Sequence, residues 1–311
     1  MNKDVLTTRV ADMLMQAGFI TSERCYVRPR SFDLVARRGT LLLLLKILSN
    51  IDGLNEKTAI EVRRLSKYLL GSPLLVGEKT RDHRLERGVV YFRYGVPTVT
   101  INTLADCLLN DVPPFVYAAH GGLYVKIDGE LLRQLRLAQG LSLGALAEEL
   151  SVSRRTVSKY EMDSMDTSID VALRLEEIFN RELIKPVDMM ATMTVKADMS
   201  PIEAIEDNVL RHLAQIGFEV VPTTQSPFNA VTQNDDLVVL TGVSKYSSTM
   251  LKKAKLMSSL SVVTKTRSAV IVDGDTKLEC IEETVLIERR ELKTIDKTSE
   301  FADLMMEKQG R

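Results

Sequence analysis

One stretch decides the fold of the middle of the chain: LLRQLRLAQGLSLGALAEELSVSRRTVSKYEMDS, residues 131–164. Its apolar positions follow helical spacing up to Ala138, and Gly140 then offers the left-handed conformation in which helices commonly end. Ser142 is of a residue type that caps helix N-termini, so a short second helix should begin after it. The stretch therefore predicts short helices joined by tight turns.

The next turn and helix extend this pattern. Ser151-Val152-Ser153 is typical of a turn in which Ser153 caps a third helix. On that helix Val157 and Tyr160 are three residues apart and should face a core. A polar set is left on the opposite, exposed side: Arg154, Arg155, Ser158 and Lys159. A fourth helix, from Ile169 to Phe179, should close the bundle.

These residues resemble the Cro/C1-type (Xre-like) helix-turn-helix family. The resemblance rests on LRQLRLAQGLS, on the small residue in LAEEL, on SVSRRTVSKYE and on the helix that follows. In that family the third helix docks in the major groove of duplex DNA and the second bridges the backbone. The resemblance therefore implies a sequence-specific DNA-binding transcriptional regulator that docks helix three, residues 153–161. The DNA-binding residues that it implies are Ser153, Arg154, Arg155, Ser158 and Lys159.

Two further positions follow from the resemblance. Arg133 and Glu161 correspond to a pair that often ties helix one to helix three, which is a structural role. The family commonly has glutamine just after the N-cap of helix two, where it contacts phosphate, whereas Leu143 stands there in this chain. One backbone contact is therefore in doubt. A helix-turn-helix that serves only protein contact is the alternative, although the exposed cations favour DNA.

The segments on either side of residues 125–190 have a different pattern. Residues 1–113 follow the order helix, three strands, helix, strand, and the third strand, TLLLLLKIL, should be buried on both faces because it does not alternate. The second helix is expected at Glu56–Leu70. Strands are expected at Cys25–Val27, Phe32–Ala36, Thr40–Leu48, Pro73–Val76, Val89–Phe92 and Thr98–Ile101.

Residues 198–311 resemble a divergent repeat of the first segment. PFNAVTQNDDLVVLTGV (227–243) aligns with SFDLVARRGTLLLLLKI (31–47) without a gap, at a shift of 196 residues. Helices at Ile202–Ile216 and Met250–Ser258 and a strand at Ala269–Val272 complete the parallel. The predicted fold is therefore multidomain, with an all-α helix-turn-helix bundle between two α/β domains.

The order of elements in residues 1–113 resembles the restriction-endonuclease-like (αβββαβ) core. Its PD-(D/E)xK motif holds Mg²⁺ through two acids and positions a lysine. Asp33 and Lys46 fall in suitable strands, but Leu44 stands where the second acid is required. In the repeat the matching residues are Asn229, Leu240 and Gly242. We therefore predict no enzyme activity and no catalytic, cofactor-binding or metal-ligating residues. The alternative is a metal-dependent DNA nuclease targeted by its helix-turn-helix.

Composition is that of a soluble globular protein, expected in the cytoplasm, and the overall charge of −1 says little about its partners. The chain is 45% hydrophobic and 27% charged, and its longest apolar run, 40–49, is too short to span a bilayer. Its three scattered cysteines fit reduced thiols rather than a disulfide framework or a zinc site. The whole architecture resembles archaeal helix-turn-helix transcriptional regulators with degenerate nuclease-like flanking domains. The partners expected are double-stranded DNA and a second copy of the chain, with no cofactor and an effector left open.

Overall fold

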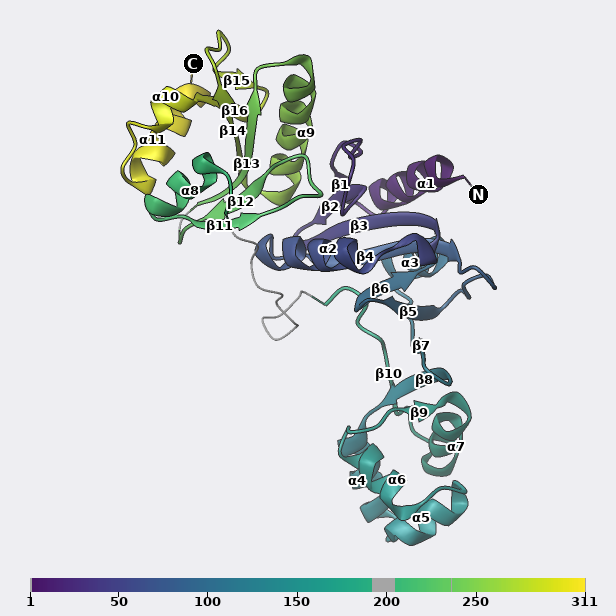
Figure 1. Cartoon of the computed structure of the whole chain (residues 1–311). Helices are drawn as coiled ribbons and strands as arrows, with labels where there is room; N and C mark the ends of the chain where they lie inside the picture. Colours follow the sequence, from purple (N-terminus) through teal and green to yellow (C-terminus); the bar gives the residue numbers. More distant parts are fainter. Residues whose placement is uncertain (1, 192–204, 236, 311) are drawn as a thin grey trace. The chain divides into compact units, whose positions relative to one another are not determined.

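The structure is a computed structural model that describes residues 2–191, 205–235 and 237–310 (Figure 1). Its internal contacts divide the chain into two compact units. One unit, here called the α/β unit, combines Met1–Leu75 with Met190–Arg311, and the other, the helix-turn-helix unit, is Val76–Met189.

The first half of the α/β unit follows the order helix, three strands, helix, strand. Its elements are α1 (Lys3–Gln16), β1 (Ile20–Thr21), β2 (Leu34–Arg38), β3 (Leu41–Asn50), the 3-10 helix η1 (Ile51–Gly53), α2 (Glu56–Tyr68) and the beginning of β4 (Ser72–Lys79). β1, β2 and β3 are antiparallel neighbours. The apolar run in β3 is buried from Leu42 to Ile47, as predicted, and both α1 and α2 pack against this strand.

The strand expected at Cys25–Val27 is wrong. The first strand lies earlier, at β1, and residues 25–27 have no regular structure. Cys25 donates one backbone hydrogen bond to Asp33 O, at 2.9 Å. The Pro29 that follows lacks an N–H to continue a ladder. Cys25 is buried in the core without forming a strand, whereas Tyr26 is exposed.

The second half of the α/β unit repeats the mixed architecture around a six-stranded sheet of order β11-β12-β13-β14-β16-β15. Its elements are α8 (Asn208–Gln215), β11 (Glu219–Pro222), β12 (Ala230–Gln233), β13 (Val238–Lys245), α9 (Ser248–Thr264), β14 (Arg267–Asp273), β15 (Cys280–Ile281), β16 (Thr284–Glu288), α10 (Arg289–Leu292) and α11 (Thr298–Gln309). The helix predicted from Ile202 begins at Asn208, where Asp207 caps it, and residues 202–204 lie outside the described residues. Helix α9 contacts β13 and β14 and also β2 of the first half, which explains its burial on several sides.

The strand registers of the two halves agree at the shift of 196 residues. Leu34 pairs with Leu45 in the first half, and Ala230 pairs with Thr241 in the second. A side-chain hydrogen bond recurs as well. Asp33 accepts from the Ile47 N–H at 2.8 Å, and Asn229 accepts from the Val243 N–H at 2.8 Å. Asp33 therefore makes the same hydrogen bond to β3 that Asn229 makes to β13, although only Asp33 is an acid.

The helix-turn-helix unit contains strands as well as helices. Its elements are β5 (Val89–Arg93), β6 (Val96–Val99), α3 (Ile101–Leu109), β7 (Val116–Ala119), β8 (Gly122–Ile127), α4 (Gly129–Ala138), α5 (Leu143–Glu149), α6 (Arg154–Glu161), β9 (Thr167–Ser168), α7 (Ile169–Phe179) and β10 (Ile184–Lys185). The sequence reasoning missed α3: the strand expected to reach Ile101 ends at Val99, and Thr100 caps a helix by accepting from the Thr103 N–H.

The expectation of an all-α bundle is not confirmed. Helices α4 to α7 lie where the sequence predicts them, but β8 pairs with both β9 and β10 beside them (Figure 1). Val125 and Ile127 of β8, together with Leu183 just before β10, belong to the same buried cluster as the helices. Helices this short leave apolar surface uncovered, and the strands bury it.

Candidate nucleic-acid interface

Helix α6 is fixed at its start by a local cap. Ser153 has extended backbone angles, and its Oγ accepts a hydrogen bond from the Thr156 N–H at 3.1 Å. The same Oγ lies 2.8 Å from Thr156 Oγ1. Such caps satisfy backbone donors that have no partner inside the helix. Ser153 therefore already has a structural role before any ligand is considered.

The inward face of α6 sets its orientation. Val157 is fully buried and Tyr160 is 4% exposed, both in the cluster that also holds Leu146 and Ala147 of α5. Ala147 is a small residue at the place where α5 and α6 meet, and small residues allow helices to approach closely. Because the buried residues are three apart, the positions between and beside them are directed away from the core.

The structure brings the five predicted DNA-binding residues together on one short helix. Ser153, Arg154 and Arg155 are exposed, and Ser158 and Lys159 are partly exposed. Within the part of the chain that the structure describes, neither Arg154 nor Arg155 forms an ion pair. Their guanidinium groups therefore keep their hydrogen-bond donors available, and a guanidinium can form a fork onto guanine or phosphate.

Arg154 lies against the start of α5. A Cβ built at Gly144 would be 2.8 Å from Arg154 Nε and 3.1 Å from one of its terminal nitrogens. The absence of a side chain at Gly144 thus leaves the space that the Arg154 guanidinium occupies. Leu143, where the family commonly has glutamine, packs against the buried cluster instead of offering a polar group. Arg154 places a cation beside the helix terminus where that glutamine would stand.

The ion pair predicted between Arg133 and Glu161 is wrong in its arginine. Arg136 makes it: its Nε lies 2.5 Å from Glu161 Oε1, and a second nitrogen donates to Oε2 at 3.0 Å. Arg136 is 8% exposed, whereas Arg133 is exposed. Arg136 lies one turn after the buried Leu132, which places it on the inner face of α4. The Glu161 carboxylate, through this hydrogen bond, holds the pKa of Arg136 above its ordinary value.

Gly129 allows α4 to begin against the end of α6. A Cβ at this position would lie 2.3 Å from Tyr160 O and 2.8 Å from Asp163 Oδ1. The Gly129 N–H donates to the same Asp163 carboxylate at 3.0 Å. Together with the Arg136–Glu161 pair, this close approach holds helix one on helix three. No sequence pattern distinguished Gly129 from a loop glycine.

The nuclease-like corner of the α/β unit keeps one acid of the metal motif, Asp33, and has Leu44 in place of the second. Asp33 is fully buried, and its Oδ1 lies 2.6 Å from Arg30 Nε and 2.8 Å from Lys3 Nζ. Leu44 is buried in the core. Among the described residues, no group of three or more histidine, cysteine or acidic side chains is placed to hold a metal ion. The Asp33 carboxylate is instead engaged by cations of its own chain.

Neighbouring positive charges favour the ionised form of the Asp33 carboxyl. Burial alone would raise the pKa of this carboxyl, but Lys46, Lys3 and the Ile47 N–H together hold it below its ordinary value. Lys46 Nζ donates to Arg30 O at 2.5 Å. The lysine of the motif is therefore present and turned inward, without the second acid that metal binding requires.

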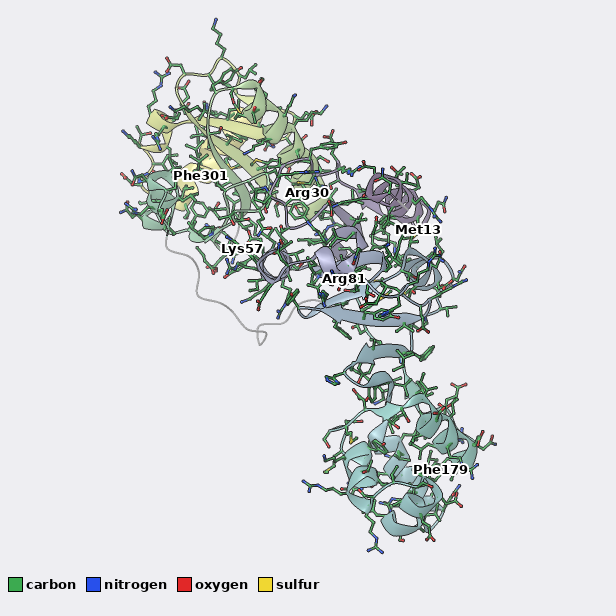
Figure 2. The ribbon with its side chains drawn as sticks, turned by 45° about the vertical axis from the view of Figure 1, so that its right-hand side comes forward. Met13, Arg30, Lys57, Arg81, Phe179 and Phe301 are labelled. Atoms are coloured by element: carbon green, nitrogen blue, oxygen red, sulfur yellow. The ribbon has the colours of Figure 1, made fainter. Side chains whose placement is uncertain are left out.

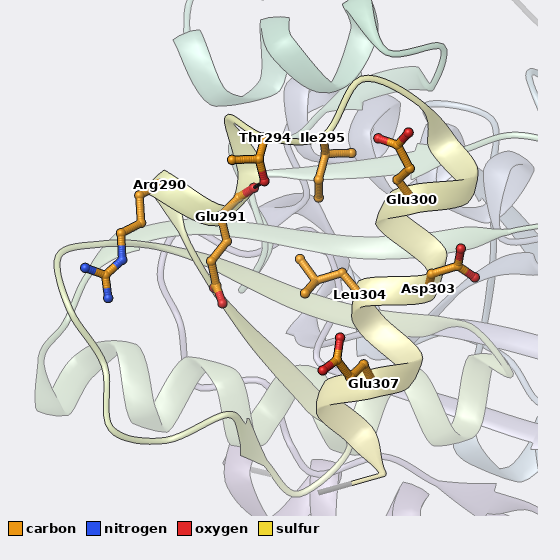
Figure 3. Close-up of a pocket in the computed structure, with 8 residues that line it drawn as sticks. All are labelled: Arg290, Glu291, Thr294, Ile295, Glu300, Asp303, Leu304 and Glu307. Atoms are coloured by element: carbon orange, nitrogen blue, oxygen red, sulfur yellow. Dashed lines mark hydrogen bonds between the residues drawn. The ribbon is translucent and has the colours of Figure 1, made fainter.

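A cavity near the C-terminus is lined mainly by acidic side chains, in contrast to the cationic surface of α6. It has a volume of about 740 Å³, and Figure 3 shows Ile295 and Leu304 lining it together with the carboxylates of Glu291, Glu300 and Glu307. Lys308 Nζ lies 2.8 Å from Glu291 Oε1, so one of these acids is paired. An acid-lined surface of this kind repels a phosphate backbone.

Comparisons with known proteins identify both the nuclease-like domain and the helix-turn-helix in this chain. Residues 3–114 match the PD-(D/E)XK superfamily domain, and residues 132–185 match the helix-turn-helix family. The chain is 48% identical to a protein of Methanococcoides burtonii, over 100% of this chain and 99% of the relative. It is 50% identical to one of Methanocella arvoryzae and 46% identical to one of Methanosarcina mazei, each over 99% of this chain and 98% of the relative. All three relatives are named "Putative HTH-type transcriptional regulatory protein". The chain belongs to this family.

In this HTH-type regulator the archaeal resemblance noted from the sequence is confirmed, as is the presence of the helix-turn-helix and the nuclease-like domain. No solved structure matches the chain. None of the helices that the structure describes has the length and apolar character needed to cross a membrane.

Proposed function

We propose that this protein is a transcriptional regulator that reads specific DNA sequences by docking α6 in the major groove. One observation carries the proposal. Arg154 and Arg155 are exposed without an internal ion-pair partner among the described residues, on a helix that Val157, Tyr160 and the Arg136–Glu161 pair hold in one orientation. A rigid helix with free guanidinium groups is what base readout requires.

The two arginines have different parts in this proposal. Arg155 supplies a base contact, because its exposed side chain is not committed to a neighbouring helix. Arg154 supplies a phosphate contact, because it lies against the start of α5, the helix that bridges the DNA backbone in this family. Ser158 and Lys159 extend the same surface along the helix. Ser153 contributes through the start of α6, where the backbone N–H groups favour an anion.

The flanking segments have a supporting role in this proposal. We infer the domain division 1–113, 125–190 and 198–311, with the last a divergent repeat of the first. The shared strand register and the equivalent Asp33 and Asn229 hydrogen bonds support the repeat. We also propose a cytoplasmic homodimer that reads two half-sites about one helical turn apart, the usual arrangement for this class.

The test begins with a duplex selected from a random library by the purified full chain. Binding of that duplex should weaken linearly with the logarithm of salt concentration, because phosphate contacts release counterions. Arg155→Ala should cost about 1–3 kcal/mol of binding free energy and relax preference at one base pair. Arg154→Ala should weaken binding to all sequences alike. Arg174→Ala, an exposed arginine on α7, is the matched control and should bind as the wild type does.

Two outcomes would count against the proposal. Binding that neither α6 variant weakens would remove α6 from the interface and favour a protein–protein role. Cleavage of supercoiled plasmid with Mg²⁺ or Mn²⁺, abolished by Lys46→Ala, would favour the metal-dependent nuclease instead. The engagement of Asp33 by Lys3 and Arg30 and the presence of Leu44 both speak against that second function.

A further inference from the structure

A second cavity lies in the α/β unit, next to the lysine of the degenerate nuclease motif. It has a volume of about 680 Å³, within the usual range for pockets that hold small molecules. Its walls come from the loop before β2, from β3, from the start of α2 and from the loop before β12. Figure 2 labels Arg30 and Lys57, two of the cationic residues that line it. Nothing in the DNA-binding role of α6 uses this cavity.

The cavity carries an excess of positive charge. Arg30, Lys46 and Lys57 line it against a single acid, Glu56. Asp33 lies behind Lys46 but already faces Lys3 and Arg30 as well, so one carboxylate is shared among three cations. Buried cations that outnumber their counter-charges are costly to a fold. A bound anion would offset that excess.

Lys46 is the centre of the imbalance. Its side chain is 8% exposed, and one of its three N–H donors is used by Arg30 O. Burial lowers the pKa of Lys46 to about 8, although Asp33 opposes this and the neighbouring Lys3 and Arg30 reinforce it. The remaining donors are available to an acceptor in the cavity that the side chain lines.

The start of α2 adds to the attraction. Asn55 caps this 13-residue helix by accepting from the Thr58 N–H at 2.8 Å. The first N–H groups of a helix have no partner inside the helix and carry a partial positive charge. Lys57 is exposed at the same end. Phosphate groups bind where a helix N-terminus and cationic side chains converge.

The loop from the second half of the α/β unit closes one side of the cavity. Gln225 O accepts from the Ser31 N–H at 2.7 Å, and Gln225 Oε1 accepts from Thr58 Oγ1 at 2.8 Å. The Thr224 N–H donates to the buried Glu61 carboxylate at 3.2 Å. This hydrogen-bonded wall bounds a space of the size of a compact ligand. It also means that a ligand in the cavity touches both halves of the unit.

We propose that this cavity binds a small molecule bearing a phosphate monoester, held by Lys46, Arg30, Lys57 and the start of α2. In this proposal the lysine of the degenerate nuclease motif serves as an anion-binding group, while Leu44 stands in place of the second acid of metal binding. A ligand that bridges Arg30 and Lys46 on one side and Thr224 and Gln225 on the other is placed to act as an effector of the regulator.

The test measures the melting temperature and calorimetric binding of the full chain with ribose 5-phosphate, with ribose and with chloride at equal ionic strength. Ribose 5-phosphate should stabilise and bind the protein, and neither ribose nor chloride should. Lys46→Met should weaken ribose 5-phosphate binding at least ten-fold, the scale of a charge-assisted hydrogen bond. Lys57→Ala, at an exposed position, should weaken it about three-fold. Lys252→Ala, an exposed lysine on α9, is the control and should leave binding unchanged.

Two results would overturn the proposal. One is the absence of any ribose 5-phosphate binding by a wild-type protein that still binds its selected duplex. The other is a loss of duplex binding in Lys57→Ala equal to that in Arg154→Ala, because the cavity would then belong to a DNA-contacting surface. The α6 variants and the cavity variants thus separate this inference from the proposed function.

Discussion

Helix α6 and the surroundings of Asp33 and Lys46 use arginine and lysine in opposite ways. In the helix-turn-helix unit, Arg154 and Arg155 are exposed on a helix whose buried face is apolar. In the α/β unit, Arg30 and Lys46 turn inward around Asp33 and beside a cavity. Residue type alone therefore indicates neither a DNA contact nor a catalytic group. Burial and the partners already engaged decide which cations are available to a ligand and which stabilise the fold.

The largest expected effect is on the stability of the helix-turn-helix, in which Arg136 is a buried cation. Arg136→Ala leaves Glu161 buried without its partner, and the free energy of opening α4 and α6 should fall by about 3–5 kcal/mol. Arg133→Ala, three residues earlier and exposed, should change it by less than about 0.5 kcal/mol. Amide hydrogen exchange of the two helices in the full chain measures both. Equal effects of the two variants would contradict the conclusion that Arg136, rather than Arg133, is the partner of Glu161.

The next effect concerns the buried carboxylate of the α/β unit. Asp33→Asn keeps an acceptor for the Ile47 N–H, as Asn229 does for Val243, but removes the charge that faces Lys3 and Arg30. The unit should lose about 1.5–3 kcal/mol of stability, measured by urea unfolding. Asp4→Asn, whose carboxylate is mostly exposed, is the control and should be close to neutral. An unchanged stability in Asp33→Asn would show that the cations do not depend on this charge.

The same carboxylate gives a pH dependence with a defined sign. The pKa of Asp33 is lower in the folded protein than in the unfolded chain. Its contribution to stability is therefore fully present above the unfolded pKa, about 3.9, and is lost as pH falls through the lower folded pKa. Asp33→Asn should flatten that part of the acid-unfolding curve. A curve that keeps its slope in the variant would assign the acid transition to other carboxyls.

A smaller effect is expected where α4 meets α6. Gly129→Ala would bring a Cβ within 2.3 Å of Tyr160 O, a backbone atom that cannot move unless α6 shifts. Strain of this kind costs about 1–3 kcal/mol. The melting temperature and the affinity for the selected duplex should therefore fall together. Retention of both would show that the helices can separate without consequence.

The smallest expected effect separates stability from binding. At Gly144 the nearest atom to an added Cβ is Arg154 Nε, at the end of a flexible side chain that can move aside. Gly144→Ala should therefore keep the stability or raise it by up to about 1 kcal/mol, since alanine favours helix more than glycine does. Duplex affinity should fall about three-fold as Arg154 is displaced. An affinity equal to that of the wild type would show that Arg154 works from another position.

The local structure of the helix-turn-helix could be predicted from the amino-acid sequence alone. Caps at Ser142 and Ser153, the glycine at Gly140 and the spacing of Val157 and Tyr160 are short-range signals, and the helices begin and end where those signals predict. The apolar run of β3, interrupted by Lys46, is equally local, and the alignment of 31–47 with 227–243 is read from the sequence without a structure. Periodicity and capping depend on neighbours within a few residues, so they can be recognised without a fold.

The side chains that meet across different elements could not be predicted in this way, because they depend on the packing of the fold. The sequence offered Arg133 and Arg136 within one helical turn, and packing of α4 on α6 selected Arg136. From the sequence, Asp33 and Lys46 are remnants of a metal site. In the fold, Lys3 and Arg30 contact Asp33, and a cavity lies beside Lys46. The strand at β8 joined the helical core because of residues far from it in the chain. Such choices depend on distances between segments remote in sequence, which no local pattern records.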